Sequence, residues 1–235
     1  MRNTEAAYKG AVTTMKTNMM QLSKFISWSV FGDGFVGYSN NNKNAHYAIQ
    51  RSPEHKDYIN MISDKFSELQ DCNVSVGEYI RKDNNKSVIF LRTSSHPIFS
   101  RIRERQYQDG HRVIDPHQLT FLDWEAMAIL YMDDGSLCVN NKGSLITRIS
   151  TCAYCYAEQE LLRIEFIKRF NLIFNINKCG KFWQLNLAKQ SRDLFYKNIT
   201  PYILDSYKYK LPEFLQKGTP RTGGDLVCIG GSPDR

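Results

Sequence analysis

One order of secondary-structure patterns occurs twice in this 235-residue chain, and the duplication restricts the fold more than any other feature. Each half shows an apolar helix, strands, a second helix, a hairpin, a short helix and a basic loop, in that order. The Asp-Gly pairs that end the two apolar helices, at Asp33 and Asp134, stand 101 positions apart. A period of almost half the chain predicts two similar halves and excludes a solenoid of short repeats.

The first half is predicted to span residues 19–116. Its apolar helix keeps helical spacing at Met19, Leu22, Ile26 and Val30 and ends at the first Asp-Gly pair. The other elements expected here are a strand over 45–50, a helix opening at 52–54, hairpin strands over 74–80 and 88–93, a short helix over 97–105, and a basic loop through Arg112.

The second half is predicted to span residues 117–216. Thr120, followed three residues later by Asp123, predicts a capping box at the start of its apolar helix. The other elements expected here are strands over 137–139 and 145–151, a helix over 157–170 carrying Leu161, Ile164, Phe166 and Ile167, hairpin strands over 174–176 and 182–187, a short helix near Ser191, and a basic segment over 208–212. Residues 1–18 are expected to form an N-terminal extension and the Gly/Pro-rich residues 217–235 a flexible tail.

The charge balance favours a polyanionic partner. Lys and Arg total 31 against 24 Asp and Glu, which gives a formal net charge of +7 and a sequence pI near 9.0. Nucleic acid is the leading candidate, although a solubilising surface fits the charge alone equally well. The chain begins without an apolar leader and holds no apolar run of membrane-spanning length, so we expect a soluble intracellular protein with reduced thiols.

Asp33 and Asp134 are the strongest candidates for chemistry. An isolated Asp-Gly pair is typical of a turn, but here each pair ends an apolar helix and leads into strand residues. Two such helices packed side by side would bring the carboxylates together at one end. Close carboxylates repel each other and favour a bound cation, and oxygen ligands suit Mg²⁺. Paired acids with Mg²⁺ are suited to hydrolysis of phosphodiesters.

The predicted strands offer a recognition surface. Alternation places Gln184 and Asn186 on the face opposite Leu185, and places Arg148 and Ser150 on the face opposite Ile149. Gln, Asn and Arg read purine edges in the major groove of DNA, and basic turns would contact phosphates. Polar residues on the exposed face of any antiparallel sheet are the alternative interpretation. The predicted DNA-binding residues are His46, Gln50, Arg81, Lys82, Lys86, Arg92, Arg148, Ser150, Gln184 and Asn186.

Residues 26–34 and 127–135 resemble the two nine-residue motifs of LAGLIDADG homing endonucleases. The second matches more closely through its Tyr-Met-Asp-Asp-Gly-Ser ending, whereas the first keeps the Asp-Gly end and the apolar character. The resemblance extends over about residues 21–212. It implies the single-chain branch of the family, a mixed α/β fold with two αββαββα halves, saddle-shaped antiparallel sheets and two central packed motif helices. It also implies a monomer that uses two or more Mg²⁺ ions to cut both strands of a long, asymmetric double-stranded DNA site across the minor groove, leaving short 3′ overhangs.

The family pattern assigns roles to four residues. The aspartate before the final glycine binds the metal, which implies Asp33 and Asp134, while Asp133 falls where the family has a small residue and receives no catalytic role. A basic residue near each metal centre corresponds to Lys210, in a Tyr-Lys-Leu-Pro segment, and to Arg112, where the spacing differs. Such a cation would stabilise developing charge or orient water, and the alternative for both residues is phosphate anchoring.

Two other functions use the same scaffold. One is an RNA-binding splicing factor, or maturase, which occurs in the same family. The other is a DNA-binding regulator without catalysis. Retention of both aspartates favours the nuclease, because RNA binding alone requires no metal ligands and uncompensated acids repel phosphate.

Overall fold

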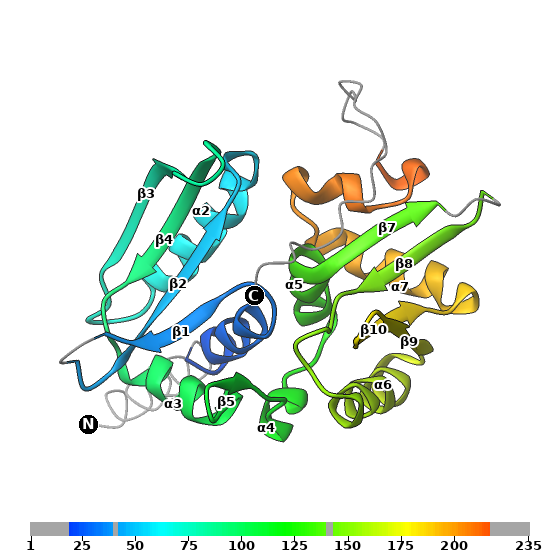
Figure 1. Cartoon of the computed structure of the whole chain (residues 1–235), viewed down its shortest axis with the longest axis horizontal. Helices are drawn as coiled ribbons and strands as arrows, with labels where there is room; N and C mark the ends of the chain where they lie inside the picture. Colours follow the sequence, from blue (N-terminus) through cyan, green and yellow to red (C-terminus); the bar gives the residue numbers. More distant parts are fainter. Residues whose placement is uncertain (1–18, 40–41, 140–142, 217–235) are drawn as a thin grey trace, which may run out of the picture. The chain divides into compact units, whose positions relative to one another are not determined.

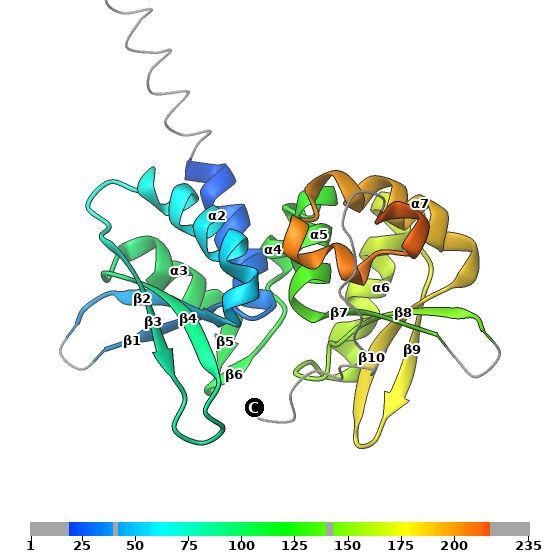
Figure 2. The same ribbon diagram turned by 90° about the horizontal axis from the view of Figure 1, so that it is seen from above.

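The computed structural model describes residues 19–39, 42–139 and 143–216, which form two four-stranded antiparallel sheets with their helices (Figures 1 and 2). The predicted N-terminal extension and tail lie outside these residues. By its internal contacts the chain divides into two compact units. The first holds residues up to Val30 and Gly34–Glu104, and the second holds Phe31–Asp33 and the residues from Arg105 onward. Asp33 and Asp134 therefore belong to the same unit.

The first unit contains a sheet with the strand order β1-β2-β4-β3. Helix α2 packs against β3 and β4, burying Tyr58, Ile62 and Phe66. The elements are a helix over residues 19–31, β1 (Phe35–Tyr38), β2 (Ala45–Arg51), the 3-10 turn η1 (Pro53–His55), α2 (Lys56–Ser67), β3 (Val74–Ile80), β4 (Ser87–Thr93) and α3 (Pro97–Gln106), which runs on into the second unit.

The second unit contains a sheet with the equivalent strand order, β7-β8-β10-β9. Helix α6 packs against β9 and β10, and α5 contacts α7. The elements are β5 (Tyr107–Gln108), β6 (His111–Arg112), α4 (Pro116–Thr120), α5 (Trp124–Asp134), β7 (Gly135–Val139), β8 (Leu145–Ile149), α6 (Tyr156–Phe170), β9 (Phe174–Cys179), β10 (Phe182–Leu187), η2 (Lys189–Ser191), α7 (Arg192–Ile199), η3 (Thr200–Tyr202), η4 (Asp205–Lys210) and η5 (Glu213–Leu215).

The mixed α/β class with antiparallel sheets is confirmed. The order helix, two strands, helix, two strands, helix runs from residue 19 to α3 and again from α5 to α7. The most apolar of these helices, α5, is only 11 residues long. Within the described ranges, no helix combines the length and the apolar character needed to cross a bilayer.

The start of α5 differs from the prediction. The capping box expected at Thr120 is wrong, because the N-cap of α5 is Asp123, whose Oδ1 accepts a hydrogen bond of 2.9 Å from the backbone N of Ala126. Thr120 instead ends the short helix α4, and its hydroxyl donates to the backbone O of His117 at 2.6 Å. An aspartate at an N-cap also places a negative charge at the positive end of the helix, which favours Asp123 over the earlier threonine.

The basic loop predicted through Arg112 is a short hairpin. Strands β5 and β6 pair through Tyr107 with Arg112 and Gln108 with His111. The two residues between them, Asp109 and Gly110, have φ angles of 49° and 80°. Two consecutive positive φ angles form the tight turn that matches the twist of hairpin strands. Strands of two residues are too short to show a period, so the sequence pattern indicated a loop.

Helix α6 is confirmed, but its buried face is not the one that carries most of its branched apolar residues. Phe166 is buried, whereas Leu161 and Ile164 are 46% and 51% exposed. The buried face includes Leu162 and the polar Gln159. The Gln159 amide nitrogen donates to three backbone oxygens, at distances between 2.9 and 3.1 Å. Burial of Gln159 is tolerated because its donors are satisfied.

Candidate functional site

Asp33 and Asp134 each follow directly on the carboxyl end of an apolar helix. The helix over residues 19–31 leads through Gly32 to Asp33, and Asp134 is the last residue of α5. The positions from Ala126 to Met132 in α5 are all buried, so this helix is fixed by packing on every side. Both aspartate side chains are half-buried. The carboxyl end of a helix carries partial negative charge, so a carboxylate there is unfavourable without a nearby cation.

Asp133 connects the two aspartate segments. Its Oδ2 accepts a hydrogen bond of 3.2 Å from the backbone N of Asp33. Gly32 faces the same carboxylate, and a Cβ built on Gly32 would lie 2.6 Å from the Cβ of Asp133, closer than Cβ atoms approach other heavy atoms. The missing side chain at residue 32 therefore makes room for Asp133. This contact holds the backbone of Asp33 beside the end of α5, next to Asp134.

Lys210 binds the carboxyl end of α5. Its Nζ lies 2.6 Å from the backbone O of Met132, 3.4 Å from that of Tyr131 and 3.5 Å from that of Asp133. The last carbonyl groups of a helix have no partner within the helix, and a cation is favourable there. The Tyr131 hydroxyl donates to the backbone O of Lys210 at 2.7 Å, which ties this residue to the same helix. The Lys210 charge therefore lies directly before Asp134.

Arg112 binds the carboxyl end of the first motif in the same way. Its Nη1 donates to the backbone O of Phe31 at 3.2 Å and to that of Gly32. Phe31 and Met132 stand 101 positions apart, and Arg112 and Lys210 stand 98 apart. The two cations thus occupy equivalent positions in the duplicated pattern. The structure places both aspartates and both cations of the prediction in the second unit.

Tyr154 covers the end of the first motif beside Arg112. Its ring stacks on Phe31 with 4.4 Å between centroids, and its hydroxyl donates to the backbone O of Phe31 at 3.1 Å. Burial raises the pKa of Tyr154. Burial opposes the charge of Arg112, but Tyr107, Tyr154 and Asp134 together keep its pKa above the ordinary value. Because Asp134 acts on both Arg112 and Tyr154, its carboxylate lies within electrostatic range of the first motif's end.

The donor atoms at this site fit a divalent cation that binds together with a phosphate. In the part of the chain that the structure describes, no group of three or more His, Cys, Asp or Glu side chains could hold a metal ion. Asp33 and Asp134 provide carboxylate oxygens, the ligand type that Mg²⁺ prefers. Mg²⁺ is commonly bound by one or two carboxylates, with waters and substrate phosphates as its other ligands. Two carboxylates are therefore a sufficient protein contribution.

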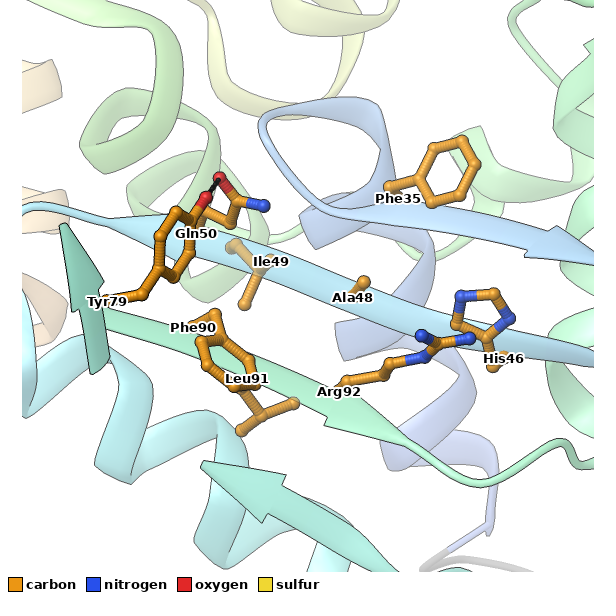
Figure 3. Close-up of a pocket in the computed structure, with 9 residues that line it drawn as sticks. All are labelled: Phe35, His46, Ala48, Ile49, Gln50, Tyr79, Phe90, Leu91 and Arg92. Atoms are coloured by element: carbon orange, nitrogen blue, oxygen red, sulfur yellow. Dashed lines mark hydrogen bonds between the residues drawn. The ribbon is translucent and has the colours of Figure 1, made fainter. Parts of the chain in front are cut away.

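The first sheet carries a hollow of about 340 Å³, shown in Figure 3. Three of the predicted DNA-binding residues, His46, Gln50 and Arg92, line it. The prediction that His46 faces outward needs correction, because the residue is only 9% exposed, and burial followed by the charge of Arg92 lowers its pKa. Gln50 and Arg92 are exposed. The lining residues are Phe35, His46, Ala48, Ile49, Gln50, Tyr79, Phe90, Leu91 and Arg92.

The polar side chains around this hollow are held by hydrogen bonds within the unit. The Tyr79 hydroxyl donates to Gln50 Oε1 at 3.0 Å, and Arg81 Nη2 lies 3.4 Å from the same oxygen. Arg92 Nη2 donates to Ser39 Oγ at 2.9 Å. These bonds join three strands and the loop after β1, and they order Gln50 and Arg92 before any ligand binds.

The turn between β3 and β4 carries the predicted cations Arg81, Lys82 and Lys86, all of them exposed. The backbone N of Arg81 donates to the backbone O of Lys86 at 2.9 Å and closes the turn. Exposed cations at a hairpin tip suit contact with a polyanion. The turn therefore extends the polar surface of the first sheet with positive charge.

On the second sheet, Arg148, Ser150, Gln184 and Asn186 are half-buried, while Ile149 is buried, so the predicted alternation is confirmed. Arg148 and Asn186 lie opposite each other on β8 and β10. Arg148 Nε and Asn186 Oδ1 are buried and have no hydrogen-bond partner among the described residues. Buried polar atoms usually have a partner, so a water or a ligand group is expected at this pair.

Sequence reasoning missed Asp133, Tyr154, Ser39 and Tyr79. For Asp133 a signal was present, because Asp133 and Gly32 stand 101 positions apart, the same interval as the two motif aspartates. Equivalent positions of two duplicated helix ends meet here, and a glycine on one side allows an aspartate on the other. The other three act through contacts between separate elements, which no local pattern shows.

Comparison with known proteins gives matches over most of the chain. Residues 24–195 match the family model described as the LAGLIDADG DNA endonuclease family. The cytochrome b mRNA maturase bI2 of Debaryomyces hansenii is 25% identical over 193 residues, which cover 80% of this chain and 72% of that protein. The probable intron-encoded endonuclease 1 of Wickerhamomyces canadensis is 26% identical over 193 residues, which cover 78% of this chain and 80% of that protein.

A solved structure has the same fold. The homing endonuclease I-WcaI bound to its DNA recognition sequence superposes with a TM-score of 0.68 at 21% identity. The match covers 81% of this chain and 85% of that one. Two antiparallel sheets with their helices are therefore a known arrangement, and the residue-level chemistry has to come from the contacts described above.

Proposed function

The chain belongs to the LAGLIDADG DNA endonuclease family, and on that basis we propose that it hydrolyses both strands of a long, asymmetric site in duplex DNA. The observation that carries the proposal is the pairing of acid and cation at each motif end. Asp134 follows the α5 carbonyls that bind Lys210, and Asp33 follows the carbonyls that bind Arg112. The hydrogen bond from the backbone N of Asp33 to Asp133 keeps the two aspartate segments adjacent.

Asp33 and Asp134 would hold Mg²⁺ together with a phosphate of the DNA. The bound metal would activate a water molecule and stabilise the leaving oxygen of the phosphodiester. The chain's own part is positioning. Packing of α5 on all sides fixes Asp134, and the contact with Asp133 fixes the backbone of Asp33. A rigid site limits the reorganisation that the reaction requires.

Lys210 and Arg112 would provide positive charge beside the two carboxylates. Each guanidinium or ammonium group is directed to backbone oxygens one or two positions before its aspartate. There it offsets the negative end of the helix and the added charge of a phosphate. In this proposal both residues stabilise charge that develops on the phosphate, and the hydrogen bonds to carbonyl oxygens keep their side chains in place.

The exposed faces of the two sheets would bind the DNA. Gln50 and Arg92 on the first sheet and Arg148 and Asn186 on the second carry the donor and acceptor groups that read base edges. Lys82 and its neighbours in the β3–β4 turn would contact phosphates. Since one chain supplies both sheets and both acids, we propose that it acts as a monomer.

The proposal is tested with Asp33→Asn and Asp134→Asn. Duplex DNA carrying randomised positions is first selected by binding to the protein in Ca²⁺, and the enriched site is then incubated with each variant in Mg²⁺. Each substitution removes a metal ligand while preserving the side chain's shape, so double-strand cleavage should fall by on the order of 100-fold or more. Affinity in Ca²⁺ should stay within about 3-fold, because phosphate and base contacts are unchanged.

Glu54→Gln, at an exposed carboxylate in η1 of the first unit, provides the matched control and should cleave at the wild-type rate. Full cleavage by either aspartate variant would remove that residue from the site. Failure of the wild type to cut any selected DNA in Mg²⁺ would overturn the proposed activity.

A second function is favoured by one relative. The Debaryomyces hansenii protein, 25% identical to this chain, carries the name of a cytochrome b mRNA maturase. A maturase would bind intron RNA and promote splicing on the same scaffold. The aspartate variants separate the two functions, because splicing assistance without metal chemistry should survive Asp33→Asn and Asp134→Asn, whereas DNA cleavage should not.

A further inference from the structure

The amide oxygen of Gln50 is engaged inside the protein. Arg81 Nη2 lies 3.4 Å from Gln50 Oε1, and the Tyr79 hydroxyl lies 3.0 Å from the same atom, the bond drawn in Figure 3. A guanidinium has donors and no acceptor, so the Gln50 atom that faces Arg81 must be the oxygen. The Tyr79 hydroxyl must then donate to that oxygen as well. Two donors from the β3 end of the sheet therefore fix the orientation of the amide.

This orientation leaves the amide nitrogen of Gln50, with its two N–H donors, to contact a base. A glutamine that reads adenine accepts a hydrogen bond from N6 and donates one to N7. Both lone pairs of the Gln50 oxygen already receive donors, so accepting from adenine would require breaking an internal bond. Guanine presents two acceptors, N7 and O6, on its major-groove edge. An amide that only donates matches guanine better than adenine.

The rest of the hollow is consistent with the same polarity. Arg92 lies opposite Ala48 in the sheet register and brings a second side chain that donates and cannot accept. None of the nine lining residues carries a carboxylate, the group that accepts from the amino group of cytosine. Phe35, Ala48 and Phe90 form an apolar floor between Gln50 and Arg92 (Figure 3).

We infer that this hollow selects guanine at one base pair of the duplex target, with Gln50 as the reading side chain. Tyr79 and Arg81 act through Gln50 as positioning residues that determine its polarity. The inference rests on the proposed function, since it concerns the DNA that the first sheet would bind. It differs from the usual expectation for glutamine, which pairs with adenine when its amide is unconstrained.

The experiment is a binding selection with the full-length protein in Ca²⁺, using duplex DNA that carries randomised positions. Selection with the wild type and with Gln50→Ala identifies the position at which the variant loses its base preference. At that position the wild type should prefer guanine over adenine by about 10-fold or more, the discrimination expected of a paired contact. Preference for adenine there, or no position that depends on Gln50, would overturn the inference.

Two variants test the positioning residues. Tyr79→Phe removes one donor from the Gln50 oxygen, so the amide can accept again and the preference for guanine should fall to within about 3-fold at that position alone. Arg81→Ala should shift the preference in the same direction, and it keeps the test available if Tyr79→Phe does not fold. Tyr38→Phe is the control, because Tyr38 is 49% exposed on β1 of the same sheet and does not line the hollow. An unchanged guanine preference in both test variants would contradict the role of the network.

The two levels of failure are distinguishable. If the wild type enriches no DNA sequence, the proposed function fails and the inference fails with it. If the wild type enriches a defined site whose Gln50-dependent position holds adenine, DNA recognition stands and only the assignment of guanine is wrong.

Discussion

Lys210 and Arg112 place a positive charge at each of the two helix ends that carry a candidate metal-binding aspartate. The hydrogen bond of 2.6 Å from Lys210 Nζ to the backbone O of Met132 puts the ammonium group within two residues of Asp134. Two roles are compatible with this position, namely stabilisation of charge during cleavage and anchoring of a DNA phosphate. A binding measurement and a rate measurement respond differently to these roles.

Lys210→Met should slow single-turnover cleavage by about 100-fold at saturating enzyme, because the charge beside Asp134 is lost. Affinity in Ca²⁺ should change little. Lys208→Met is the control, since Lys208 lies in the same η4 segment but its Nζ pairs with Asp205 Oδ1 at 2.6 Å. Weakened binding, a salt slope reduced by about one unit and a normal cleavage rate would show that Lys210 is a phosphate anchor instead.

The contact between Gly32 and Asp133 predicts a specific coupling of stabilities. Gly32→Ala alone should lower the free energy of unfolding by about 1–3 kcal/mol, because the new methyl group would overlap the Asp133 side chain. In the Asp133→Ala background the same change should cost almost nothing, since the overlapping group is gone. Urea denaturation of the four proteins measures the coupling. Equal effects of Gly32→Ala in both backgrounds would refute the contact.

The sequence predicts which residues carry charge at the site better than it predicts what they touch. Asp33 and Asp134 follow from their position after apolar helices, and Lys210 and Arg112 follow from the family resemblance. The bond from Asp33 to Asp133 is different, because it joins groups 100 positions apart and depends on how two chain segments meet. Side-chain polarity, as at Gln50, is likewise decided by contacts across strands.

Helix α5 carries one of the two aspartates, so its first turn affects the site indirectly. Asp123→Ala should lower the free energy of unfolding by about 1 kcal/mol, because the bond from the backbone N of Ala126 to Asp123 Oδ1 is lost. Thr120→Ala removes a hydroxyl that bonds within α4 and should cost less than about 0.5 kcal/mol. Thermal unfolding of both variants decides between the two caps. A larger effect of Thr120→Ala would support the capping box predicted from the sequence.

At the level of elements, periodicity located the main helices and strands but could not choose the buried face of α6. Leu161 and Ile164 keep helical spacing and are exposed, whereas Gln159 on the opposite side is buried and fully hydrogen-bonded. A helix with apolar residues on two sides has no unique inward face until its neighbours are placed. Very short elements such as β5, β6 and α4 lie below the length at which a period can be recognised.

For the whole molecule, the duplication and the positive charge belong to one argument. Two copies of one element order give two sheets with the equivalent strand orders β1-β2-β4-β3 and β7-β8-β10-β9. Each sheet carries Gln, Asn or Arg side chains on one face, and the chain has a net charge of +7. A long asymmetric DNA site suits such a protein, because two similar but unequal surfaces can read two different half-sites.

The last prediction concerns the electrostatic part of that recognition. Affinity for the selected DNA should fall steeply between low and moderate salt, with a slope of about −0.9 in log K per log salt for each phosphate contacted. Replacing both Lys82 and Lys86 with Gln in the β3–β4 turn should reduce the magnitude of the slope by one to two such steps. Lys168→Gln is the control, because this lysine is exposed on α6 and pairs with Glu165 at 3.6 Å. A flat salt response of the wild type would show that the positive charge serves solubility and does not bind DNA, and an equal effect of Lys168→Gln would remove the turn from the DNA-binding surface.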